Sequence, residues 1–194
     1  MTLALLYGAS SGALHAVTGP DHVLSLGPVA LKQPRSPWKI GLLWGVGHAL
    51  GTLALALPLV WWSTVAPLPW LAALGDRLGG VALMLMAGWS WWSLRRPLSS
   101  KDADTRRPWL IGLVHGITGA TSLLLVLPML VSGSPSLTLT YLLAFALGST
   151  LAMATLTSAL ARLGQRLSPP LVTRLQRSLV GVSFAVGALW LARA

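Results

Sequence analysis

Long apolar runs dominate this sequence, and apolar positions rarely alternate with polar ones as they do on a water-facing surface. The segments 81–88, 123–131 and 141–147 contain almost no polar side chain. A bilayer core about 30 Å thick requires roughly 20 apolar residues for each helix that crosses it. Divided at its polar gaps, the chain has room for about six such helices. The pattern therefore predicts an all-α membrane protein with six transmembrane helices.

Short polar or proline-rich connectors separate the six expected helices. Their ranges are about 2–31, 38–62, 78–94, 108–131 and 137–160, with a last helix that ends near 192. The first range contains the segment Thr18-Gly19-Pro20-Asp21-His22. Proline removes a backbone donor and clashes with the preceding turn. We therefore expect the first helix to be broken at Gly19-Pro20.

Basic residues fall mainly on one side of the expected membrane. Twelve of the 14 lysines and arginines lie in the connectors after the first, third and fifth helices. Loops rich in lysine and arginine usually face the cytoplasm. The charge pattern therefore predicts that both termini lie outside (N-out, C-out). Tryptophans near the ends of the apolar runs, such as Trp61 and Trp91, suit membrane interfaces.

Composition agrees with this interpretation and excludes other classes. Hydrophobic residues make up 54% of the 194 positions and charged residues 9%, whereas soluble domains carry about 25% charged residues. The net charge of +10 is divided among short gaps instead of forming a patch, which argues against nucleic-acid binding. The absence of cysteine excludes disulfides and thiolate chemistry. The first apolar run has no basic segment before it, so we expect a retained span and no signal peptide.

The sequence contains a duplicated pattern. The segment GALHAVTG at 12–19 aligns with GLVHGITG at 112–119, and GHAL at 47–50 aligns, one residue further on, with GSTL at 148–151. Gly80-Val81 matches Gly181-Val182 at the same second offset. Three helices per copy is an odd number, so the second copy enters the membrane from the opposite side. Inverted repeats with broken helices and a site near the midplane recur in transporters.

We therefore predict one transmembrane domain over residues 1–194. It consists of a first repeat at about 1–94, a basic cytoplasmic loop at about 95–107 and a second, inverted repeat at about 108–194. The first helix of each three-helix repeat is expected to be broken.

The chemically active side chains are few and share one depth. All four histidines lie inside predicted spans, and Asp21 is the one acidic residue placed deep in a span. Ionisable groups in hydrocarbon are costly and usually face the bundle interior. His22, His48 and His115 lie about 10 to 15 Å inside the membrane at 1.5 Å per residue. Together with His15 and Asp21 they form a nitrogen and oxygen ligand set that suits Ni²⁺, Co²⁺, Fe²⁺ or Zn²⁺.

Each of these residues also has a structural interpretation. Asp21 lies where an N-cap of the second half-helix is expected, and His48 and His115 suit hydrogen bonds between helices. Beside two histidines in a membrane segment, we favour Asp21 as a ligand. The break also frees carbonyls such as that of Ala16. Trp44 and the methionines are interpreted as packing residues.

Two motifs resemble the nickel/cobalt transporter family and its urease-accessory-type relatives. The segment HAVTGPDH at 15–22 is similar to that family's His, spacer and Asp-His, and GHA at 47–49 is similar to its Gly-His-Ser. His115-Gly116 looks like the second-half motif of the urease-accessory branch. The resemblance implies Ni²⁺ or Co²⁺ transport across a prokaryotic inner membrane, with His15, Asp21, His22 and His48 contacting the metal. The sequence departs from the pattern in its five-residue spacer and in Ala49.

We expect a transporter and not an enzyme. The cation is its substrate, no cofactor is required, and its partners are the cation and the lipid bilayer, with a homo-oligomer left open. The alternative is an exporter of a non-metal solute that uses the histidines as a proton relay. A redox carrier of related architecture needs a cysteine pair, and a metal-dependent hydrolase needs a general base, for which Asp21 alone is available. No phosphate-binding loop for ATP is present.

Overall fold

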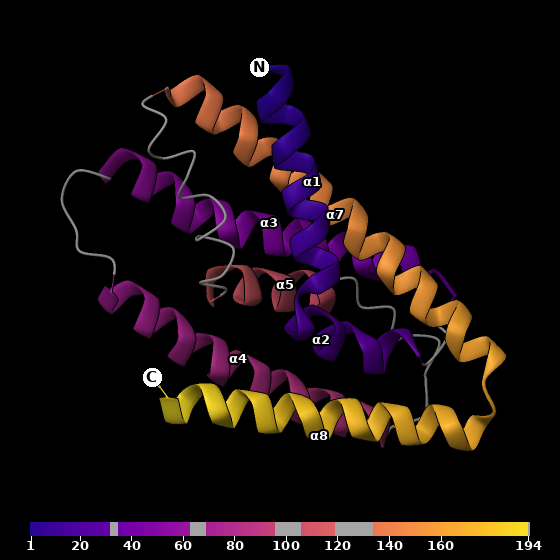
Figure 1. Ribbon diagram of the computed structural model, residues 1–194. Coiled ribbons are helices and arrows are strands. Elements are labelled where there is room, and N and C mark those ends of the chain that lie inside the picture. The colour runs from indigo at the N-terminus through magenta and orange to yellow at the C-terminus, as the bar shows by residue number, and fades with distance from the viewer. Residues whose placement is uncertain (32–34, 63–68, 96–105, 119–133, 194) are drawn as a thin grey trace.

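The computed structural model describes residues 1–31, 35–62, 69–95, 106–118 and 134–193, and these residues form seven helices and no strand (Figure 1). The all-α prediction is confirmed for this part of the chain. The helices, in order, are α1 (Thr2–Thr18), α2 (Pro20–Ala30), α3 (Pro37–Trp62), α4 (Pro69–Leu94), α5 (Arg106–Thr118), α7 (Pro135–Arg166) and α8 (Pro169–Arg193).

Proline marks the start of five of these seven helices. The φ angle of proline is already close to the helical value. Its missing N–H has no consequence in the first turn, where backbone N–H groups have no intrahelical acceptor. A proline between two apolar runs therefore begins the next helix at little cost. This explains why α4 starts at Pro69 and not near residue 78, as the sequence pattern predicts.

The expected break in the first apolar run is present. The chain leaves α1 at Gly19, whose backbone is extended (φ −65°, ψ 109°), and enters α2 at Pro20. The Gly19 N–H donates to the His15 carbonyl at 2.9 Å and closes the last turn of α1. The corresponding break expected in the second half falls in 119–133, outside the described residues.

Three of the described helical segments are long and apolar enough to cross a membrane, where the sequence predicts six. They are Pro37–Pro58, Pro135–Arg166 and Pro169–Ala192. The break divides the first run into helices of 17 and 11 residues, and the apolar part of α5 is also short. The described helices therefore support three candidate spans and do not support the full six-span arrangement.

Helix α7 buries small polar side chains and exposes large apolar ones, unlike a typical helix of a soluble domain. Ser149 and Thr157 on α7 are fully buried, while the same helix exposes leucines at every fourth position, Leu139, Leu143, Leu147 and Leu151. Residues four apart lie on one helical face, so these leucines form an apolar stripe. Contiguous exposed apolar surface of this kind marks contact with a membrane or another protein.

Glycines bring two pairs of helices into backbone contact. α1 packs against α7, and α3 packs against α5. A Cβ at Gly12 would overlap the carbonyl of Phe145, and a Cβ at Gly148 would overlap that of Ala9. Small residues permit this close approach between membrane helices. The interface therefore excludes larger side chains.

The same arrangement joins the second pair of helices. A Cβ at Gly112 on α5 would overlap the carbonyl of Trp44 on α3, and a Cβ at Gly47 would overlap that of Trp109. Figure 1 shows α5 in the middle of the bundle, with α1 and α2 meeting near one end of it and α4 running antiparallel to α8 along the far side. The ends of α1, α2 and α5 and the middle of α3 thus meet in the interior.

Candidate metal centre

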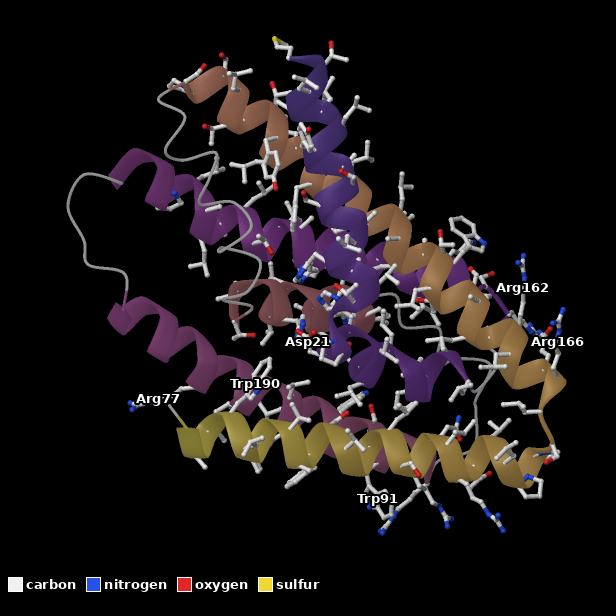
Figure 2. The ribbon with its side chains drawn as sticks, in the orientation of Figure 1. Asp21, Arg77, Trp91, Arg162, Arg166 and Trp190 are labelled. Carbon is white, nitrogen blue, oxygen red and sulfur yellow. The ribbon has the colours of Figure 1, made fainter. Side chains whose placement is uncertain are left out.

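Four helices bring the five predicted site residues to one buried place. His15 lies in the last turn of α1, Asp21 and His22 in the first turn of α2, His48 in α3 and His115 in α5. None of the five is more than 7% exposed. The break at Gly19 and Pro20 turns α2 so that its first residues face His15. Figure 2 shows Asp21 in the interior, between α2 and α5.

His22 is at the centre of the group. Its ring centroid lies 4.7 Å from that of His15 and 5.2 Å from those of both His48 and His115. The rings of His15 and His48 are 5.7 Å apart and nearly parallel. Because His22 is fully buried, all these contacts are made away from the surface of the bundle.

The ligating atoms form two overlapping triads. One comprises His15, His22 and His48, and the other comprises Asp21, His22 and His115. Within each triad, all three nitrogen or oxygen atoms lie within 4.8 Å of one another. The triads share His22, so they are neighbouring positions of one centre and not two separate sites.

Two hydrogen bonds determine which nitrogens are available. The His22 Nδ1–H donates to the Ala16 carbonyl at 3.1 Å, an acceptor that the helix break frees. His115 Nε2 donates to Asp21 Oδ2 at 2.8 Å. A neutral imidazole that donates from one nitrogen keeps a lone pair on the other. His22 therefore offers Nε2, and His115 offers Nδ1.

Four imidazole nitrogens in the described part of the chain are buried without a hydrogen-bond partner. They are His22 Nε2, both ring nitrogens of His48, and His115 Nδ1. An unsatisfied buried polar atom costs about 1–3 kcal/mol. They belong to three neighbouring rings, and a bound cation would relieve one nitrogen of each ring.

The structural interpretations of these residues fit less well. The N-cap of α2 is Gly19, which makes no side-chain capping bond, and the Asp21 carboxylate instead accepts from His115. His48 makes no interhelical hydrogen bond through its ring among the described residues. His115 does bond across helices, to Asp21, and at the same time borders the centre.

Trp44, interpreted from sequence as a packing residue, is part of the site. Its ring stacks on His48 at 5.2 Å with an interplanar angle of 13°, and lies 5.4 Å from His22 and 5.2 Å from His115. It closes one side of the centre against the core. Its position four residues before His48 on α3 puts both on one face, and this spacing was the available signal.

These helices and this centre define the class: an α-helical protein with apolar candidate spans and a buried histidine–aspartate cluster. The chain is similar to two chloroplast proteins of Arabidopsis thaliana. It is 25% identical to "Chloroplast protein FOR GROWTH AND FERTILITY 2" over 167 residues, covering 77% of this chain and 45% of that protein. It is also 25% identical to "Chloroplast protein FOR GROWTH AND FERTILITY 1" over 202 residues, covering 92% and 55%.

The chain thus spans about half the length of the curated relatives it matches. No family profile matches the chain, and no solved structure matches it either.

These relatives correct three expectations. The resemblance to the nickel/cobalt transporter family is wrong, because the matches are to plant chloroplast proteins. The bacterial origin and the prokaryotic inner membrane are wrong for the same reason, and the N-out, C-out assignment made relative to a cytoplasm falls with them. The physical reason is that histidines and an aspartate beside a helix break encode ligand chemistry and not ancestry. The motif match was also sharp over only about twenty residues.

Proposed function

We propose that the protein moves a divalent transition-metal cation across a membrane, using His15, Asp21, His22, His48 and His115 as its ligands. The observation that carries the proposal is the set of unpartnered imidazole nitrogens around the buried His22. Imidazole and carboxylate ligands suit first-row divalent cations. The expected preference for nickel or cobalt rested on the family resemblance and is withdrawn with it.

The shared residue gives the site a transport step. His22 Nδ1 is held by the Ala16 carbonyl, so Nε2 is the one nitrogen that His22 offers. One nitrogen lone pair binds one cation, and the two triads therefore cannot be filled together. A cation held by His22 exchanges His15 and His48 for Asp21 and His115 as it moves. Two overlapping positions that a cation fills in turn suit a protein that transports the cation better than one that stores it.

We further propose that the protein is built from two inverted three-helix repeats, with the centre where they meet. Under the sequence alignment, residue 12 corresponds to 112 and residue 44 to 145. Two contacts are then equivalent: Gly12 of the first copy meets Phe145 of the second, and Gly112 of the second copy meets Trp44 of the first. Exchange of this kind is the property of a two-fold axis.

Ring contacts support the same correspondence. His15 faces Phe145 at 5.7 Å, and its counterpart His115 faces Trp44 at 5.2 Å. Inverted repeats with a midplane site commonly expose that site to each side in turn.

The alternative is a proton relay in an exporter of a non-metal solute, and the Asp21–His115 hydrogen bond favours it. A relay needs a continuous series of donors and acceptors. His48 interrupts the series, because both its ring nitrogens lack a partner in the described residues. We propose transport and not catalysis, since Asp21 serves as a ligand in the second triad and the described cluster holds no other carboxylate to act as a general base beside a metal-bound water.

Transport is tested with the full chain in liposomes that contain a fluorescent chelator, using a panel of divalent cations from Mn²⁺ to Zn²⁺. We expect uptake of at least one cation, its loss in His22→Gln, and little change in Met84→Leu. Glutamine keeps much of the size of histidine but places no ring nitrogen at the centre. Uptake by His22→Gln equal to that of the unmodified chain would refute the proposal, provided that both proteins melt at the same temperature.

A further inference from the structure

A second site lies at the far side of the bundle from the histidines. A pocket of about 340 Å³ opens between the end of α4 and the beginning of α8. Ligand pockets start at roughly 300 Å³, so this one holds a small group and not a whole amphiphile. Its lining consists of Trp91, Leu94, Arg95, Thr173, Gln176 and Arg177. None of these belongs to the candidate metal centre.

Two arginine side chains line this pocket. Arg95 and Arg177 both line it, and both are exposed. The described lining of the pocket contains no carboxylate, so within this part of the chain neither guanidinium faces an acidic side chain across the pocket. Two guanidinium groups that share one cavity favour an anion between them.

One wall of the pocket orients Arg95, and the other is tied to a neighbouring helix. The Arg95 guanidinium lies over the Trp91 ring at 4.8 Å from its centroid, a cation–π contact. On the other wall, buried Gln176 donates from Nε2 to the Pro28 carbonyl at 3.1 Å and ties α8 to α2. The pocket therefore has one side chain oriented by Trp91 and one wall tied to α2.

The place of the pocket suits the headgroup of a lipid. Trp91 lies on the outer face of the α4–α8 pair, as Figure 2 shows. Its side chain is 41% exposed, and so is that of Leu171, which lies near the arginines in the sequence of α8. α8 is one of the three candidate spans. A charged pocket at the end of such a span can bind a polar headgroup, and the exposed apolar surface beside it can contact the acyl chains. Basic pockets between membrane helices bind anionic headgroups in this way.

We propose that this pocket binds the phosphodiester headgroup of an anionic phospholipid, which Arg95 and Arg177 contact and whose acyl chains lie along α4 and α8. The site is independent of the histidine cluster, so it stands whether or not the protein transports a cation.

The test measures binding of fluorescently labelled phosphatidylglycerol to the full chain in a neutral detergent. The variants are Arg95→Gln, Arg177→Gln and the double variant. The matched control is Arg174→Gln, which removes an exposed charge from the same helix but does not line the pocket. A basic residue near an anionic lipid surface contributes about fivefold in affinity. We expect about fivefold weaker binding for each pocket variant, about 25-fold for the double variant, and no change for the control.

Competing ligands separate a lipid from a free anion. Unlabelled phosphatidylglycerol should displace the probe, while phosphatidylcholine and millimolar inorganic phosphate should not. Equal losses in Arg174→Gln and Arg177→Gln would overturn the proposal by showing unspecific attraction. Displacement by inorganic phosphate at the same concentration as the lipid would overturn it too, because the acyl chains would then contribute nothing.

Discussion

At the scale of single residues, the cluster is defined by how each imidazole uses its two nitrogens. His22 donates a hydrogen bond from Nδ1 to the Ala16 carbonyl, which leaves Nε2 free to bind a ligand. His48 has no hydrogen-bond partner for either ring nitrogen among the described residues. The two triads therefore differ in kind. The first contains three imidazoles, and the second adds the carboxylate charge of Asp21.

This difference predicts separate effects on binding and on passage. His48→Gln removes a ligand of the first triad and should weaken equilibrium cation binding by more than about tenfold. Asp21→Asn leaves the first triad intact, so binding should change less while the transport rate falls sharply. Calorimetry and liposome flux on the same preparations measure the two quantities. A loss of affinity in Asp21→Asn as large as in His48→Gln would contradict two successive positions.

The sequence alone predicts all five ligand candidates, because ionisable groups are rare in apolar runs and each must have a reason to be there. It does not predict Trp44 as part of the site, since a tryptophan is as common in membrane helix packing as beside a ligand. It also cannot reveal that Asp21 bonds His115, which lies 94 residues away. That contact depends on how α2 and α5 meet.

At the scale of the helices, glycine determines how closely the pairs approach. Gly12 on α1 lies against the backbone of Phe145, whereas an added Cβ at Gly181 on α8 meets nothing within 4 Å. The two positions therefore form a matched pair for the same substitution.

Alanine at these two positions should act in opposite directions. Gly181→Ala should stabilise the protein by about 0.5–1 kcal/mol, because alanine loses less backbone entropy in a helix. Gly12→Ala should destabilise it by about 1–3 kcal/mol, because α1 and α7 must move apart. Thermal unfolding in detergent measures both. A melting temperature of Gly12→Ala at or above that of Gly181→Ala would contradict the close helix contact.

Helix positions follow from the sequence better than their ends do. The break at Gly19-Pro20, the range of α3 and the end of α8 are predicted, because proline and apolar runs act locally. The start of α8 at Pro169 is not predicted, since the sequence pattern assigns Arg174 and Arg177 to the connector before it. The end of α7 at Arg166, beyond the expected 160, is not predicted. Arginine and glutamine are good helix formers, so a polar segment that resembles a connector continues the helix.

At the scale of the whole molecule, the proposed two-fold relation makes two distant interfaces equivalent. Gly112 on α5 occupies the place of Gly12, and it meets the Trp44 backbone as Gly12 meets that of Phe145. Neither the six spans nor the prokaryotic inner membrane expected from the sequence is supported, since the described helices give three candidate spans and the relatives are chloroplast proteins. The apolar runs indicate hydrophobic helices, but they do not show how a helix break divides a run. A short motif of ligand residues does not show which family a protein belongs to.

The two-fold relation predicts that Gly112→Ala lowers the melting temperature by about as much as Gly12→Ala does. The physical reason is that both substitutions press one methyl group against the backbone of the equivalent partner helix. A near-neutral Gly112→Ala beside a damaging Gly12→Ala would argue against equivalent interfaces.

The proposed function requires one divalent cation to bind among the histidines around His22. X-ray absorption at the zinc edge, on the full chain loaded with one equivalent of Zn²⁺, detects such binding. We predict a shell of nitrogen and oxygen ligands at about 2.0–2.2 Å, with the outer-shell scattering of at least two imidazoles that is reduced in His22→Gln. A shell of oxygens without imidazole scattering, or a spectrum unchanged by His22→Gln, would contradict the account.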